Sequence, residues 1–197
     1  MIVGIVAVAF VAVTGALLFE VLHTPAGVER ETQTRQRRIY SRTRTATHAR
    51  PDEVIRLLQT DWSWWKKARA EEMKDLGDGR RELLLHPNRF FNVLELPTTL
   101  RLRLEPVETL ADGGKRIRAI LTGDFDGTAE FMARPAANGT VIEFAFCGVE
   151  VRGSLSLMPL QMVAAVHSWR ERLGVEGLRD RLKAIRPETA PDPGWDN

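Results

Sequence analysis

The feature that most constrains the fold is a long helical pattern near the C-terminus, from about Pro159 to Ile185. Proline is tolerated in a first helical turn because its missing N–H has no helical partner there, and Pro187 stops the pattern. At about 1.5 Å per residue, roughly 27 residues extend about 40 Å. A helix of this length needs an extended apolar surface to lie against. The preceding residues are patterned as strands, so we expect this surface to be a β-sheet.

The apolar face of this helix is expected to be a stripe of residues spaced three and four apart. Its members are Met162, Val166, Trp169, Leu173, Leu178, Leu182 and Ile185. The charged residues that fall largely off the stripe are expected to be solvated, and they are Arg170, Glu171, Arg179, Asp180 and Lys183. The pattern therefore predicts that Trp169 faces the sheet and that Glu171 faces water.

Strand patterns fill most of the chain before this helix. Leu100, Leu102 and Leu104 alternate with charged residues, which is typical of a half-buried strand. Asn138-Gly139 is a hairpin signal. The strands expected are 38–48, 82–85, 90–96, 100–104, 115–121, 128–133 and 140–151, with a short helix from Pro51 and a tryptophan-rich turn or helix at 62–65. Grouped strands with short connections, followed by a long helix, indicate an α+β domain with an antiparallel sheet.

The N-terminus carries an uncharged run from Ile2 to Phe19, which resumes after Glu20. About 20 apolar residues cross a bilayer core, so residues 1–23 are predicted to be a transmembrane helix that anchors the protein. A cleaved signal peptide is the alternative. The length of the run and the absence of Lys or Arg before it disfavour a signal peptide, although Ala16 and Ala26 lie among small residues where a peptidase could cut.

An excess of arginine follows this segment, with six arginines from Arg30 to Arg44 against only Glu29 and Glu31. Such an excess marks the cytoplasmic side of a membrane and is attracted to anionic lipid. We therefore predict a single-pass protein of the cell membrane, with a basic linker at 24–37 and the domain, 38–186, on the cytoplasmic side. Residues 187–197 are expected to be a disordered tail. A basic run with Tyr40 as its one aromatic gives no support for nucleic acid as a partner.

Several classes of site find no support in the sequence. Cys147 is the only cysteine, which excludes an internal disulfide, and we expect it to be a small buried side chain. The four histidines lack metal-ligand spacing, so no metal is predicted. No phosphate loop, dinucleotide fingerprint or nucleophilic serine motif occurs, so no cofactor and no catalytic residue is assigned.

Five titratable residues have both a structural and a catalytic interpretation. Asp124 and Asp126 are interpreted as turn residues, and Glu143 and Glu150 as outward-facing strand residues. His167 is interpreted as a surface or hydrogen-bonded core histidine. An inward carboxylate or His167 would be the acid or base if the protein were an enzyme.

Four stretches together resemble the START/Bet v 1-like (SRPBCC) superfamily, in its polyketide cyclase/dehydrase-like branch. They are Ala49–Val54, similar to an Ala-x-Pro-x-x-Val motif, the tryptophan-rich Asp61–Trp65, the hairpin Gly123–Thr128, and the final helix with His167–Arg170, Gly174, Gly177 and Leu178. The resemblance covers about residues 38–185. It implies a helix-grip fold, in which a curved antiparallel sheet of about seven strands wraps around a long C-terminal helix. A mostly apolar cavity lies between the sheet and the helix.

The resemblance implies a module that binds an apolar or amphipathic ligand, such as a lipid, a quinone or a polyketide-like molecule. Together with the anchor predicted from the N-terminal run, it predicts a membrane-anchored binding module. The residues expected to line the cavity are Trp62, Trp65, Phe144, Phe146 and Trp169. The expected partners are this hydrophobic ligand and the membrane. Two alternatives remain open: a cyclase/dehydratase-like enzyme, and an interaction protein whose cavity is filled by its own side chains.

Overall fold

The computed structural model describes residues 28–65, 69–70, 73–86 and 99–185. The predicted membrane segment, the predicted strand at 90–96 and the predicted tail lie outside these residues. Among the helices that the structure describes, none combines the length and the apolarity needed to cross a bilayer.

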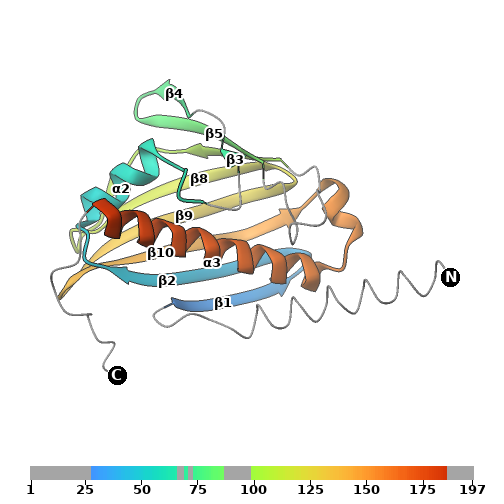
Figure 1. The fold of residues 1–197 in the computed structure, drawn as a ribbon. Coiled ribbons are helices and arrows are strands. Elements are labelled where there is room, and N and C mark those ends of the chain that lie inside the picture. The colour runs from blue at the N-terminus through green and yellow to red at the C-terminus, as the bar shows by residue number, and fades with distance from the viewer. Residues whose placement is uncertain (1–27, 66–68, 71–72, 87–98, 186–197) are drawn as a thin grey trace.

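Ten strands in the described part of the chain form one antiparallel sheet. Their order is β1-β2-β10-β9-β8-β6-β5-β3, with β4 beside β5 and β7 beside β8 (Figure 1). The strands are β1 Val28–Arg35, β2 Arg38–Thr47, β3 Arg69–Ala70, β4 Lys74–Gly77, β5 Arg80–His86, β6 Leu100–Leu104, β7 Glu108–Thr109, β8 Lys115–Gly123, β9 Phe125–Ala136 and β10 Gly139–Val151.

Two α-helices and one 3-10 helix accompany the sheet. They are α2 Pro51–Thr60, η1 Gly153–Leu157 and α3 Leu160–Ile185. Figure 1 shows α3 lying along one face of the sheet, where it contacts β2, β1 and β10, with α2 near its C-terminal end. The α+β class, the long helix, the helix beginning at Pro51 and the predicted strands within the described residues are confirmed.

The predicted basic linker at 24–37 is wrong for residues 28–35, which form β1 and pair along their whole length with β2. The two-residue turn between the strands holds Gln36 and Arg37 at φ 50° and 62°. Two-residue hairpin turns with positive φ usually contain Asn or Gly, and this turn contains neither. Arg42 and Arg44 also belong to the sheet, where their Nε atoms lie 3.1 Å and 2.5 Å from the Glu143 carboxylate.

The sheet has more strands than the seven expected, because four of the observed strands, β1, β3, β4 and β7, show no alternation of apolar and polar residues in the sequence. β1 is a polar edge strand, and edge strands are often polar because they must not recruit other chains. β3 and β7 have two residues each, and all four residues of β4 are exposed. Alternation cannot be recognised in such short or fully exposed segments.

The apolar core lies between the sheet, α2, the turn at 62–65 and the C-terminal half of α3. α2 buries Val54, Ile55, Leu57 and Leu58 against it. Two glycines of α3 allow the helix to approach the turn closely: a Cβ on Gly174 would lie 3.1 Å from the Trp65 ring, and one on Gly177 would collide with the Trp64 carbonyl oxygen.

The predicted sheet-facing stripe of α3 is correct at Leu178 and Leu182, wrong at its end, where Ile185 is exposed, and only partly correct in its first half. Leu178 and Leu182 belong to the core, but Met162, Val166 and Leu173 are only half-buried. Trp169 is buried without belonging to either apolar cluster of the described core. The side chains that face β1 and β2 are instead His167, Ser168 and Glu171.

This error has a physical cause, since hydrophobic periodicity cannot detect a buried stripe that is itself polar. For this reason the sequence pattern predicted that Glu171 is solvated, whereas the structure buries it. Cys147 is the opposite case: it was expected to be buried and is exposed. Strand alternation turns Phe144 and Phe146 inward, so the neighbouring Cys147 points outward.

Candidate functional site

Strand β2 presents hydroxyl groups to the interior. Ser41, Thr43, Thr45 and Thr47 occupy alternate positions and are all buried. Their neighbours along the strand face outward. β2 packs against α3, and the interface between them is apolar where Ile39 meets Val163 and Ala164 but polar from Ser41 onward.

A group of buried and half-buried polar side chains joins β1 and β2 to α3, and we call it the polar cluster. Ser41 Oγ donates a hydrogen bond of 2.6 Å to Glu171 Oε2. His167 Nε2 lies 3.5 Å from Ser41 Oγ and 4.0 Å from Glu171 Oε2. The hydroxyls of Thr32 and Ser168 lie 2.9 Å apart. The cluster consists of Arg30, Thr32, Ser41, His167, Ser168 and Glu171.

The two titratable side chains of α3 in this cluster have strongly shifted pKa values. Burial raises the pKa of Glu171 to about 8, although the hydroxyls of Ser41 and Thr43 and the charge of Arg30 act in the opposite direction. Burial, assisted by the charge of Arg170, lowers the pKa of His167 to about 4. At neutral pH the carboxyl is therefore mostly protonated and the imidazole is neutral.

Arg30 contributes the positive charge of the cluster. Its pKa is lowered by burial and by the charge of Arg172, while Glu171 acts to raise it. Arg30 Nη1, Thr43 Oγ1 and Glu171 Oε1 are buried and have no partner at hydrogen-bond distance among the residues that the structure describes, although the Thr43 hydroxyl acts on the pKa of Glu171. Buried polar atoms are nearly always paired, so these atoms are candidates for contact with a ligand.

An aromatic cluster fills the adjoining part of the interior, and it consists of Trp62, Trp64, Trp65, Phe131 and Phe144. The Trp62 ring lies 5.0 Å from that of Trp64 and 5.8 Å from that of Trp65. Phe131 and Phe144 meet edge to face at 4.8 Å. The Trp62 indole N–H donates to the Leu58 carbonyl at 2.6 Å, which leaves the apolar ring surface for packing.

Phe146 connects the two clusters. It lies two residues after Phe144 on the inner face of β10, and its ring is 4.4 Å from that of His167 in a T-shaped arrangement. Phe125 approaches His167 at 5.4 Å. Phe144 thus packs in the aromatic cluster, while Phe146, two residues further along β10, packs against His167 of the polar cluster.

The structure brings together most of the predicted cavity residues. Trp62, Trp65 and Phe144 share the aromatic cluster, Phe146 adjoins the polar cluster, and Trp169 is buried outside both. Their contact with a ligand stays a prediction. The structural interpretations of the acidic residues are confirmed for two of them: Glu143 faces outward to Arg42 and Arg44, and Asp124 accepts a hydrogen bond from the Thr99 backbone at 2.7 Å.

Sequence reasoning missed Ser41, Glu171 and Arg30. One signal was present, since residues 41–47 carry Ser or Thr at every second position while the other face of the strand carries Tyr and Arg. A strand with two polar faces inside a sheet implies a polar interior on one side. The spacing of four between His167 and Glu171 places both on one helix face, which is a second signal.

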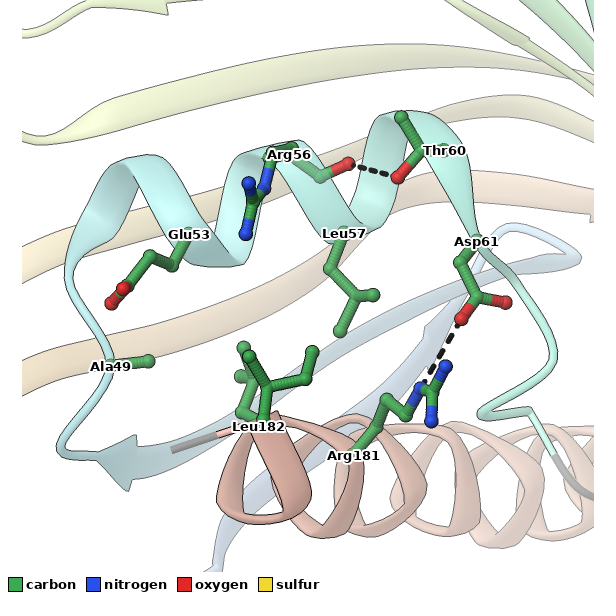
Figure 2. A pocket seen from close by; sticks show the side chains of 9 residues that line it. Ala49, Glu53, Arg56, Leu57, Thr60, Asp61, Arg181 and Leu182 are labelled. Carbon is green, nitrogen blue, oxygen red and sulfur yellow. Dashed lines mark hydrogen bonds and ion pairs between the residues drawn. The ribbon is translucent and has the colours of Figure 1, made fainter. Parts of the chain in front are cut away.

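A groove of about 360 Å³ lies at the C-terminal end of α3, between that helix and α2 (Figure 2). Leu57 and Leu182, both members of the apolar core, form its floor. Its rim is charged, and Asp61 and Arg181 face each other across it at 3.3 Å. Leu182 is eleven residues beyond Glu171, about 16 Å along the helix. The groove is therefore separate from the polar cluster.

The comparisons with known proteins identify the fold. No family model and no curated protein matches the chain. Among solved structures, a STAR-related lipid transfer protein fragment from Xanthomonas axonopodis matches with a TM-score of 0.64 at 15% identity, covering 82% of this chain and 96% of that one. Human StAR-related lipid transfer protein 5 also gives 0.64, at 13% identity, covering 92% and 98%.

The Zhui aromatase/cyclase from Streptomyces sp. R1128 matches with a TM-score of 0.50 at 12% identity, covering 83% of this chain and 99% of that one. The fold is START-like. At these identities the likeness concerns the fold alone, because one fold hosts many functions. The START-like sheet and helix place the aromatic cluster and the polar cluster side by side in the interior.

Proposed function

We propose that this protein is a binding module for an amphipathic ligand held between the sheet and α3. The observation that carries the proposal is the meeting of two surfaces in the interior: the aromatic cluster around Phe144, and the polar cluster, whose His167 lies against Phe146. A ligand with an apolar body and one polar group matches this arrangement. Mostly apolar sites with a few placed polar groups are the usual form of small-molecule sites.

The fold is consistent with this function, since two of the matching structures are named as lipid transfer proteins. We further propose that residues 1–23 anchor the protein in the cell membrane, with the domain on the cytoplasmic side. The uncharged run from Ile2 to Phe19 and the exposed arginines 35, 37 and 38 support this placement. An anchored module would take up its ligand from the bilayer or present it there.

A cyclase/dehydratase-like enzyme is the second candidate, and one observation favours it. His167 and Glu171 lie 4.0 Å apart, and their pKa values are moved in opposite directions, to about 4 and about 8. Such divergent pairs provide an acid and a base in many enzymes. If this candidate is correct, a bound compound would be converted by the wild type and would remain unchanged with Glu171→Gln.

The binding function is tested by mass spectrometry of organic extracts from full-length protein purified from its own membrane. We expect one class of amphipathic molecule to copurify with the wild type and to be lost with Phe146→Trp, which adds bulk at the junction of the two clusters. Cys147→Trp is the matched control, because the next residue along the strand points outward. If no molecule copurifies and folded protein binds no apolar probe, the interior is filled and the protein is an interaction module.

A further inference from the structure

The two carboxyl oxygens of Glu171 have different surroundings. Oε2 accepts the hydrogen bond from Ser41 Oγ at 2.6 Å. Oε1 is buried and has no partner at hydrogen-bond distance among the residues placed by the structure, although the Thr43 hydroxyl, also without such a partner, is near enough to act on the pKa of Glu171. The side chain itself is fully buried. One oxygen is thus occupied as an acceptor, and the other is the position from which the carboxyl can interact with something else.

Protonation makes this second oxygen a donor. Burial raises the pKa of Glu171 to about 8, so the acid form predominates at neutral pH. The single hydroxyl proton of Ser41 goes to Oε2, because its 2.6 Å contact is far shorter than the 3.5 Å contact with His167. The acidic proton therefore belongs on Oε1, from which it can be donated.

The surroundings of Glu171 also favour a ligand that accepts hydrogen bonds. β1 contributes Arg30, whose buried Nη1 is a second donor without a partner among the described residues. β2 contributes hydroxyls, and β10 contributes Phe146 beside His167. α3 contributes the neutral His167 and the cations Arg170 and Arg172, which act on His167 and on Arg30. Of the atoms left without a partner here, Arg30 Nη1 and the protonated Glu171 Oε1 are donors, and the Thr43 hydroxyl can donate as well as accept.

The accepting group is expected to be uncharged. Glu171 is buried between sheet and helix, where an ion would lose its hydration at a cost far greater than one hydrogen bond returns. We propose, building on the proposed ligand binding, that the polar group of the ligand is an uncharged carbonyl oxygen, of a ketone, quinone or ester, that accepts a hydrogen bond from Glu171 Oε1. The apolar part of the ligand lies toward Phe146 and the aromatic cluster.

Four compounds with one skeleton test this inference: fluorene, 9-fluorenone, 9-fluorenol and fluorene-9-carboxylate. Binding is measured by equilibrium dialysis at pH 6.5 against full-length protein in lipid nanodiscs, with empty nanodiscs subtracting the partition into lipid. We expect 9-fluorenone to bind about threefold to tenfold more tightly than fluorene, the usual return of one hydrogen bond. Glu171→Gln, whose amide still donates, should keep this preference, and Glu171→Ala should remove it.

The outcomes separate the inference from the function on which it rests. If none of the four compounds binds, the proposed ligand binding fails. Equal binding of fluorene and 9-fluorenone to the wild type overturns the carbonyl inference while leaving ligand binding intact, and it needs no variant to be folded. Tightest binding of the alcohol would make Glu171 an acceptor, and tightest binding of the carboxylate would make Arg30 the partner. Either result overturns the inference.

Discussion

Ser41 Oγ and Glu171 Oε2, 2.6 Å apart, join the middle of β2 to the middle of α3 by a buried hydrogen bond. The two residues come from opposite layers of the domain and are 130 positions apart in the chain. Elsewhere in the described part of the chain, apolar side chains such as Leu178 and Leu182 hold the helix to the sheet. A buried titratable group thus lies within the contact between helix and sheet.

The stability of the protein should fall as the pH rises from 6.5 to 8. The pKa of Glu171 is raised from 4.5 to about 8 in the folded state, so the folded protein keeps a proton that the unfolded chain releases. Its stabilising contribution is complete below pH 4.5 and is lost as the pH rises through 8, with a slope of at most about 1.4 kcal/mol per pH unit. Denaturant unfolding at a series of pH values measures this slope.

The control for this prediction is Glu171→Gln, which is neutral at every pH and should flatten the slope. His167 sets the lower limit of the window. Its pKa is lowered from 6.5 to about 4, so its contribution has the opposite sign and is lost as the pH falls from 6.5 to 4. The contribution of His167 fades above pH 6.5, and the difference in slope between the wild type and Glu171→Gln isolates Glu171. An equal slope in wild type and Glu171→Gln would show that another group titrates.

Alanine substitutions should separate the observed register of α3 from the register that hydrophobicity predicts. Leu178 is fully buried in the apolar core, so Leu178→Ala should lower the free energy of unfolding by about 2–5 kcal/mol. Leu173 is only half-buried, and the same substitution there should cost clearly less. Chemical denaturation of the two variants measures the difference. Equal losses would support the register that the sequence pattern indicates.

The layers of this fold could be predicted from the sequence because they depend on apolar pattern and turn chemistry. Leu100, Leu102 and Leu104 alternate as a strand does, and Asn138-Gly139 marks the hairpin before β10. Trp62, Trp65 and Phe144 could be grouped because large aromatic side chains seek the same interior. Each of these signals depends on nearby residues or on apolar character, so it can be recognised without knowledge of the tertiary structure.

The polar cluster could not be predicted in the same way, because its members become buried only through contacts between distant segments. In the sequence, Glu171 lies off the apolar stripe and is predicted to be solvated. Only the folded structure shows that Ser41 lies opposite it. The β1 strand is equally hidden, since its hairpin turn at Gln36 and Arg37 lacks Asn and Gly. In both cases a tertiary contact overrides the preference of the local sequence. The polar cluster lies where these two segments, β1 and α3, come together.

Gly177→Ala should destabilise the protein even though alanine is the better helix former. An added Cβ would collide with the Trp64 carbonyl oxygen, and backbone cannot move aside as a flexible side chain can. Overpacking of this kind costs about 1–3 kcal/mol, more than the helical gain of about 1 kcal/mol. Ala184→Gly at the exposed end of α3 is the control and should cost only the propensity difference. Thermal unfolding gives both values, and a stabilised Gly177→Ala would show that α3 lies farther from the turn.

The single cysteine offers a test of membrane orientation without any substitution. Cys147 is exposed on the outward face of β10. Its pKa is raised by partial burial and by the charge of Glu130, so thiolate is scarce at neutral pH and labelling should be slow but should accelerate as the pH rises. If the domain lies on the cytoplasmic side, a membrane-impermeant maleimide should leave the protein unlabelled in sealed right-side-out vesicles and label it once detergent opens them. Cys147→Ser provides the background. Equal labelling before and after detergent would place the domain on the outer side and revive the signal-peptide interpretation of residues 1–23.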